Sequence, residues 1–125
     1  MNINFESEKP IYIQIAEEIE DAILSGAFAE QTQVPSTTEI SMTYKINPAT
    51  VLKGINILVD SNILYKKRGL GMFVQEGATE LIQNKRKQAF FDGYIVNLIS
   101  EATKLKMEKQ DIISLIERGF QNERN

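Results

Sequence analysis

Residues 45–54 read KINPATVLKG, and this stretch specifies the start of a helix. Asn47 is a favoured N-cap residue, and Pro48 suits the first helical position, where a backbone N–H would have no intrahelical partner. The apolar residues that follow recur at helical spacing: Val51, Ile55, Leu58 and Val59. The spacing predicts a helix over 48–59 with one buried stripe. Its other side carries Ala49, Thr50, Leu52, Lys53 and Asn56.

A second, shorter helix is predicted just upstream. Ser36 and Glu39 have the spacing of a capping box, so this helix begins at Ser36 and ends near residue 44 or 45. Two short helices separated by about three residues are typical of a helix-turn-helix. Before them, residues 10–25 place isoleucines four apart and end at Gly26, which predicts an amphipathic first helix.

A β-hairpin is predicted directly after these helices. Residues 63–65 and 72–74 are β-prone, and the sequence KKRGLG between them supplies two glycines for the turn and three basic residues for its tip. A basic hairpin in this position is a wing. We therefore expect a mainly α fold with a small β-hairpin, in which residues 1–77 form a winged helix-turn-helix domain.

Residues 78–125 are expected to form a separate helical region. A long helical pattern, with Gly93 as its weak point, is followed by a shorter one near residues 108–120. These helices carry more apolar surface than they can bury on each other, and each large apolar side chain left exposed costs about 1.5–3 kcal/mol. We expect a dimerisation region with an interface that includes Phe90, Phe91, Tyr94, Ile95, Leu98, Ile112 and Ile116.

The composition argues against an enzyme. The 125 residues include no cysteine and no histidine, which removes the commonest general base and the thiolate chemistry of metal sites. We expect no catalytic residues, no metal and no cofactor. Residues 1–10 lack the basic start and apolar core of a signal peptide, so a cytoplasmic location is expected.

The formal net charge of −3 is unevenly distributed. Residues 1–32 hold seven acidic residues against one lysine, whereas residues 33–75 hold five basic residues against two acidic ones. An acidic protein with a basic middle can still present one positive face to nucleic acid. The same charges would also arise if the lysines were merely scattered over the surface.

Three segments together resemble the GntR family of bacterial winged-helix regulators: PIYIQIAEEIEDAILSGAF, VPSTTEI and INPATVLKGINILVDSNILYKKRGLGMFV. INPATV with RGLGMFV is similar to the YtrA-like subfamily. The resemblance implies a homodimer joined by a short two-helix C-terminal region. It also implies a repressor of its own operon, which in this subfamily frequently encodes an ABC transporter. Two positions depart from the family, because Thr38 and Leu52 stand where arginines that face DNA are common.

A helix over 48–59 would enter the major groove with its N-terminus first, and the wing tip would reach the adjacent minor groove. The residues expected to contact double-stranded DNA are Ser36, Thr37, Thr38, Lys45, Asn47, Pro48, Ala49, Thr50, Lys53, Lys66, Lys67, Arg68 and Gly69. Ser36 and Asn47 would cap their helices with or without DNA. Leu52 either contacts a thymine methyl group or lies at the edge of the interface.

The sequence thus predicts a dimeric, sequence-specific transcription regulator on a pseudo-palindromic operator. The alternative is a winged-helix module that binds protein through its acidic first helix and the hairpin. An effector of unknown identity either binds near the aromatic residues at 90–94, or those residues are simply dimer core.

Overall fold

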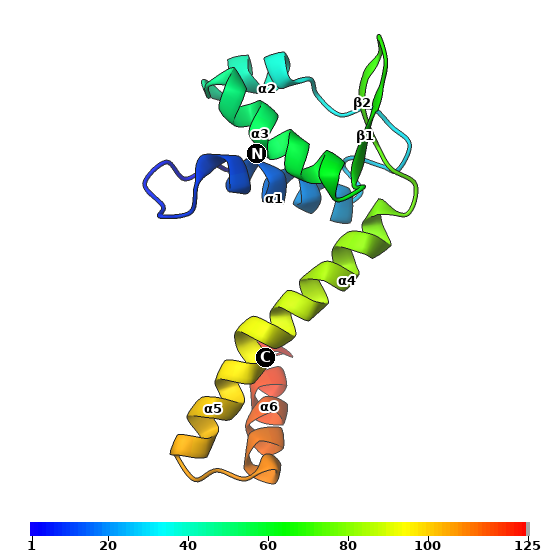
Figure 1. Ribbon diagram of the computed structural model, residues 1–125. Coiled ribbons are helices and arrows are strands. Elements are labelled where there is room, and N and C mark those ends of the chain that lie inside the picture. The colour runs from blue at the N-terminus through cyan, green and yellow to red at the C-terminus, as the bar shows by residue number, and fades with distance from the viewer. Residues whose placement is uncertain (125) are drawn as a thin grey trace. The chain divides into compact units, whose positions relative to one another are not determined.

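The computed structural model describes residues 1–124, which form two compact units, Met1–Lys85 and a second unit that begins at Arg86. The first unit contains three helices and a hairpin, as predicted, together with the start of a fourth helix (Figure 1). Its elements are α1 (Ile11–Leu24), α2 (Thr37–Tyr44), α3 (Pro48–Asp60), β1 (Leu64–Lys67) and β2 (Gly71–Val74), and α4 (Ala78–Phe90) begins in it.

The helix starts predicted from the sequence are confirmed. The Ser36 hydroxyl accepts from the Glu39 backbone N–H at 3.0 Å, and the Glu39 carboxylate accepts from the Ser36 N–H at 3.2 Å. The Asn47 side chain accepts from the Ala49 N–H at 2.8 Å, with Pro48 in the first position of α3. Caps of this kind are worth about 1 kcal/mol each, so the local sequence sets both helix starts.

α3 lies between α1 and α2 and carries the centre of the core (Figure 1). Val51, Ile55 and Leu58 are buried against isoleucines of α1. The approach is close at Gly54, where an added Cβ would lie 2.7 Å from the backbone oxygen of Tyr12. Glycine at this position is therefore what lets α1 and α3 meet.

The wing is an antiparallel pair, β1 with β2, in the register Leu64 to Val74. A segment the sequence did not mark as extended also joins it. The Val34 N–H donates to the Met72 carbonyl at 2.9 Å, and the Val74 N–H donates to the Thr32 carbonyl at 3.0 Å. The backbone just before α2 is therefore tied to the outer edge of β2.

The first turns of α4 belong to the first unit, which therefore extends beyond residue 77. Ala78 and Ile82 are fully buried in its core. The Glu30 carboxylate accepts from the backbone N–H groups of Gly77 at 2.7 Å and Thr79 at 3.1 Å. These bonds hold the beginning of the helix to the segment that follows α1.

The second unit is helical, as predicted. A π-helical segment, η1 (Phe91–Ile95), contains Gly93 and leads into α5 (Val96–Lys104), and α6 (Lys109–Arg124) follows. The Asp111 carboxylate accepts from the Glu108 N–H at 2.8 Å near the start of α6. Within residues 1–124, no helix has both the length and the hydrophobicity needed to cross a membrane.

Candidate nucleic-acid interface

The non-core side of α3 faces solvent, as an interface would require. Asn47, Pro48, Ala49 and Lys53 are exposed, and Thr50 is half-buried. The first residues of a helix leave backbone N–H groups without intrahelical partners, and the helix dipole makes this end positive. The N-terminal end of α3 is therefore suited to lie beside a phosphate backbone.

The start of α2 presents hydroxyl groups to the same region. Thr38 is exposed, while Ser36 and Thr37 are half-buried. The Ser36 oxygen is occupied by the Glu39 N–H, which leaves the serine O–H free to donate. Lys45, exposed at the left-handed C-cap of α2 with φ 55°, stands at the turn between the two helices.

The wing tip carries the largest group of exposed cations in the first unit: Lys66, Lys67 and Arg68. Gly69 follows them with φ 80°, a left-handed conformation that suits glycine. The ammonium nitrogen of Lys67 lies 4.5 Å from the centre of the Phe73 ring, which stacks on Tyr65 with the ring centres 5.9 Å apart. The two aromatic rings thus form the body of the wing and support one of its charges.

A groove of about 380 Å³ connects α2, α3 and the wing. Thr37 and Thr38 line it from α2, Leu52 and Asn56 from α3, and Lys66 from β1. It gathers three of the predicted contact elements in one concave surface. No pattern in the sequence indicates that these elements share a groove.

Gln33 lines this groove and was not among the predicted contact residues. Its side-chain amide donates to the Leu70 carbonyl at 2.6 Å, so it fixes the wing turn. Gly71 has φ 119°, a conformation that L side chains rarely adopt, and a Cβ there would lie 2.7 Å from the same amide nitrogen. No local pattern marks Gln33, because its partner is 37 residues away.

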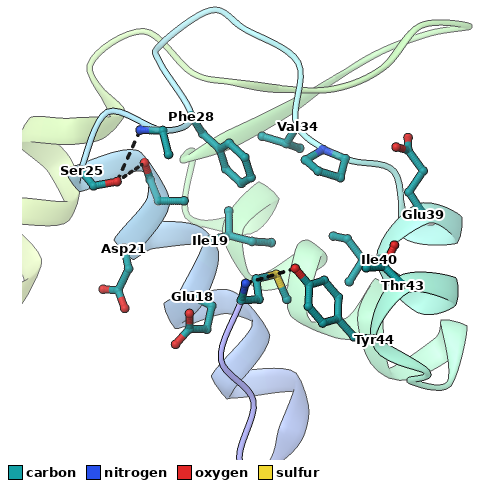
Figure 2. A pocket seen from close by; sticks show the side chains of 14 residues that line it. Glu18, Ile19, Asp21, Ser25, Phe28, Val34, Glu39, Ile40, Thr43 and Tyr44 are labelled. Carbon is teal, nitrogen blue, oxygen red and sulfur yellow. Dashed lines mark hydrogen bonds between the residues drawn. The ribbon is translucent and has the colours of Figure 1, made fainter.

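A second cavity, of about 620 Å³, lies between α1, the segment after it, and α2. Figure 2 shows apolar side chains, among them Phe28 and Ile40, around its interior. The carboxylates of Glu18, Asp21 and Glu39 also line it. Three carboxylates repel phosphate, so this face is not where nucleic acid would bind.

The predicted dimer residues divide into two groups. Phe90, Phe91 and Tyr94 are exposed at 50–69%, and the rings of Phe90 and Tyr94 lie 5.2 Å apart. Another group lines an apolar cavity of about 450 Å³ between α5 and α6: Ile95, Leu98, Ile112 and Ile116. Within residues 1–124, no cluster of acidic side chains could hold a metal ion.

The residues from α1 to β2 match a known family. The family model described as “Bacterial regulatory proteins, gntR family” matches residues 11–74. The transcriptional repressor NagR of Bacillus subtilis is 35% identical over 80 residues, which cover 64% of this chain but only 33% of NagR. The transcriptional repressor YtrA of the same organism is 28% identical over 131 residues, covering 98% of this chain and 99% of YtrA.

Solved structures agree with this match. A GntR-family transcriptional regulator from Bacteroides thetaiotaomicron has a TM-score of 0.79 and 31% identity, with 90% of this chain and 98% of that chain covered. The DNA-binding domain of AraR, in complex with operator ORX1, has a TM-score of 0.54 and 28% identity, with 59% of this chain and 95% of that chain covered. The similarity to AraR thus concerns a domain that was crystallised on DNA.

Proposed function

The chain belongs to the gntR family of bacterial regulatory proteins and is a YtrA-like, DNA-binding transcription regulator; we propose that it is a repressor that binds its operator as a dimer. The observation that carries the proposal is the exposed, pre-capped side of α3 beside the start of α2 and the wing. Asn47, Ala49, Thr50 and Lys53 contact base edges or the flanking backbone in the major groove. Arg68 reaches the adjacent minor groove.

We propose that residues 1–77 carry the DNA-binding surface and that residues 78–125 carry dimerisation, although the first turns of α4 also pack in the core of the first unit. The second assignment rests on the exposed aromatic residues Phe90, Phe91 and Tyr94 and on the open apolar cavity between α5 and α6. Covering that apolar surface with a second copy would remove it from water. Two DNA-binding units related by twofold symmetry require a pseudo-palindromic operator.

The regulated genes are proposed from the resemblance to the YtrA-like subfamily. YtrA and NagR are both named transcriptional repressors, which supports repression here. We propose that the operator precedes the operon of this protein itself, one that encodes an ABC transporter, and that the regulator acts in the cytoplasm. A small-molecule effector would bind between the C-terminal helices, near Phe90, Phe91 and Tyr94.

Selection of bound fragments from the host genome tests the proposal. We expect recovered DNA to share two inverted half-sites and to lie upstream of the gene for this protein. The predicted contact set includes five cations per subunit: Lys45, Lys53, Lys66, Lys67 and Arg68. If each of these cations neutralised one phosphate, the ten in a dimer would give a slope of log K against log salt near −9. A flat salt response, or fragments without a shared half-site, would contradict the proposal.

A further inference from the structure

Leu52 is an exposed leucine on the side of α3 proposed to face DNA. Its exposed fraction is 47%, although Val51 and Ile55 next to it on the helix are buried. A single exposed leucine is ordinary on a protein surface. Leu52 is informative because of its neighbours: it lines the groove between α2, α3 and the wing, among groups that suit a phosphate backbone.

The groove combines apolar side chains, such as Val59 and Met72, with polar groups that can bind phosphates. Thr37 and Thr38 contribute hydroxyl groups from α2, and Lys66 contributes an ammonium group from the wing. When a recognition helix lies in the major groove and a wing in the adjacent minor groove, one sugar–phosphate strand passes between them. That strand would run along this groove, with its phosphates within reach of these donors.

We propose that Leu52 reads the C5-methyl group of a thymine on that strand, so that each half-site contains a thymine at one fixed position. In B-DNA this methyl group projects into the major groove beside the backbone of its own strand, and apolar side chains recognise it by contact. A leucine cannot make the hydrogen bonds that distinguish guanine or adenine. The inference rests on the proposed function, because it assumes that α3 enters the major groove.

Deoxyuridine substitution tests the proposal, since deoxyuridine differs from thymidine only by that methyl group. Each thymine of a selected operator is replaced in turn, in both half-sites together, and binding is measured by fluorescence anisotropy. Burying one methyl group is worth about 0.8 kcal/mol, or roughly fourfold in affinity. We expect one thymine position per half-site at which the double substitution weakens binding about tenfold or more.

The Leu52→Ala variant then identifies the side chain that reads the methyl group. We expect it to bind the thymine and deoxyuridine operators equally. The Leu81→Ala variant is the control, because Leu81 is a leucine of similar exposure, 44%, on α4 outside the groove and should leave the methyl dependence intact. Circular dichroism melting verifies that both variants fold.

Two results would overturn the inference while leaving the proposed function standing. One is an operator that is bound tightly but shows no deoxyuridine-sensitive position. The other is a folded Leu52→Ala protein that retains the full methyl dependence, which would assign the contact to another side chain. A protein that recovers no specific DNA at all would instead refute the proposed function.

Discussion

The ammonium nitrogen of Lys53 lies 4.0 Å from the centre of the Tyr12 ring, so a cation on the exposed side of α3 is held by an aromatic residue of α1. Cation–π contacts at exposed sites are worth about 0.5–1 kcal/mol. Such a contact restricts the lysine without neutralising it. Lys53 therefore keeps its charge available to a phosphate while its position is defined by α1.

We expect Lys53→Met to weaken operator binding and to make it less dependent on salt. Each phosphate contact contributes about 0.9 to the slope of log K against log salt, so a dimer that loses two contacts should show a slope smaller by about two. A salt titration by fluorescence anisotropy measures this. Lys87→Met makes the same change at an exposed lysine outside the predicted contact set and should leave the slope unchanged. If Lys53→Met and Lys87→Met had the same slope of log K against log salt, Lys53 would not contact a phosphate.

Gly54→Ala should destabilise the first unit. The added methyl group would lie 2.7 Å from the Tyr12 carbonyl oxygen and 3.1 Å from Ile15, and overpacking of this kind costs about 1–3 kcal/mol. Urea unfolding followed by circular dichroism measures the loss. Gly119→Ala is the matched control: nothing lies within 4 Å of its added Cβ, so the higher helix propensity of alanine should stabilise α6 by up to about 1 kcal/mol. If the free energy of unfolding changed by a similar amount in both variants, the added methyl group at Gly54 would not be overpacked against α1.

Glu30 should make stability depend on pH in the acid range. Hydrogen bonds from the backbone N–H of Gly77, and then from Thr79, lower the pKa of the Glu30 carboxyl group. The folded state therefore favours the carboxylate more than the unfolded chain does. This stabilisation is present above the unfolded pKa, about 4.3, and is lost as the pH falls through the lower folded pKa.

The Glu30→Gln variant isolates this contribution. We expect it to be less stable than the native protein at neutral pH and to approach it in stability well below pH 4. Thermal unfolding over a pH series measures the difference. Glu8→Gln, at an exposed residue of the N-terminal segment, should change stability little at any pH. If the difference in stability between Glu30→Gln and the native protein were the same at every pH, the charge of the Glu30 carboxylate would not stabilise the start of α4.

Tyr94→Glu should separate the proposed dimer. The Tyr94 side chain is 69% exposed and contacts Phe90, so a charge there should be tolerated within one chain but not in an apolar interface. Sedimentation velocity should show a dimer for the native protein and a monomer for the variant, with weaker binding to a two-half-site operator. Phe5→Glu changes an aromatic residue of similar exposure in the first unit and should remain dimeric. A native protein that sediments as a monomer at micromolar concentration would contradict the assignment.

The sequence predicted what depends on neighbours in the chain. The capping pairs at Ser36 and Asn47 act over two or three residues, and the apolar stripe of α3 follows from helical periodicity. The π-helical segment around Gly93 falls where the long helical pattern was weakest. The caps and the stripe could be predicted because propensity, capping and periodicity all favour the same structure there, whereas the π-helical geometry itself was not predicted.

The sequence did not predict contacts between distant residues. The side chain of Gln33 donates to Leu70, and that of Glu30 accepts from Gly77. At Gly54 the backbone of Tyr12 approaches closely. Tens of residues separate the partners in each case. None of the three has a local signature, because a glutamine, a glutamate and a glycine are ordinary at those positions. Their roles follow only once the tertiary fold has brought the partners together. The groove beside Leu52 was missed for the same reason.

The central claim is that the exposed side of α3 lies in the major groove of bound DNA, and affinity cleavage tests it most directly. The chain has no cysteine, so Ala49→Cys creates a single thiol on the first turn of α3 to which an iron–EDTA chelate can be attached. The same chelate on Glu8→Cys serves as the control. We predict strand cleavage within each half-site of a selected operator from position 49, in two symmetric clusters, and little from position 8. Operator that is bound but cleaved no more from position 49 than from position 8 would contradict the claim.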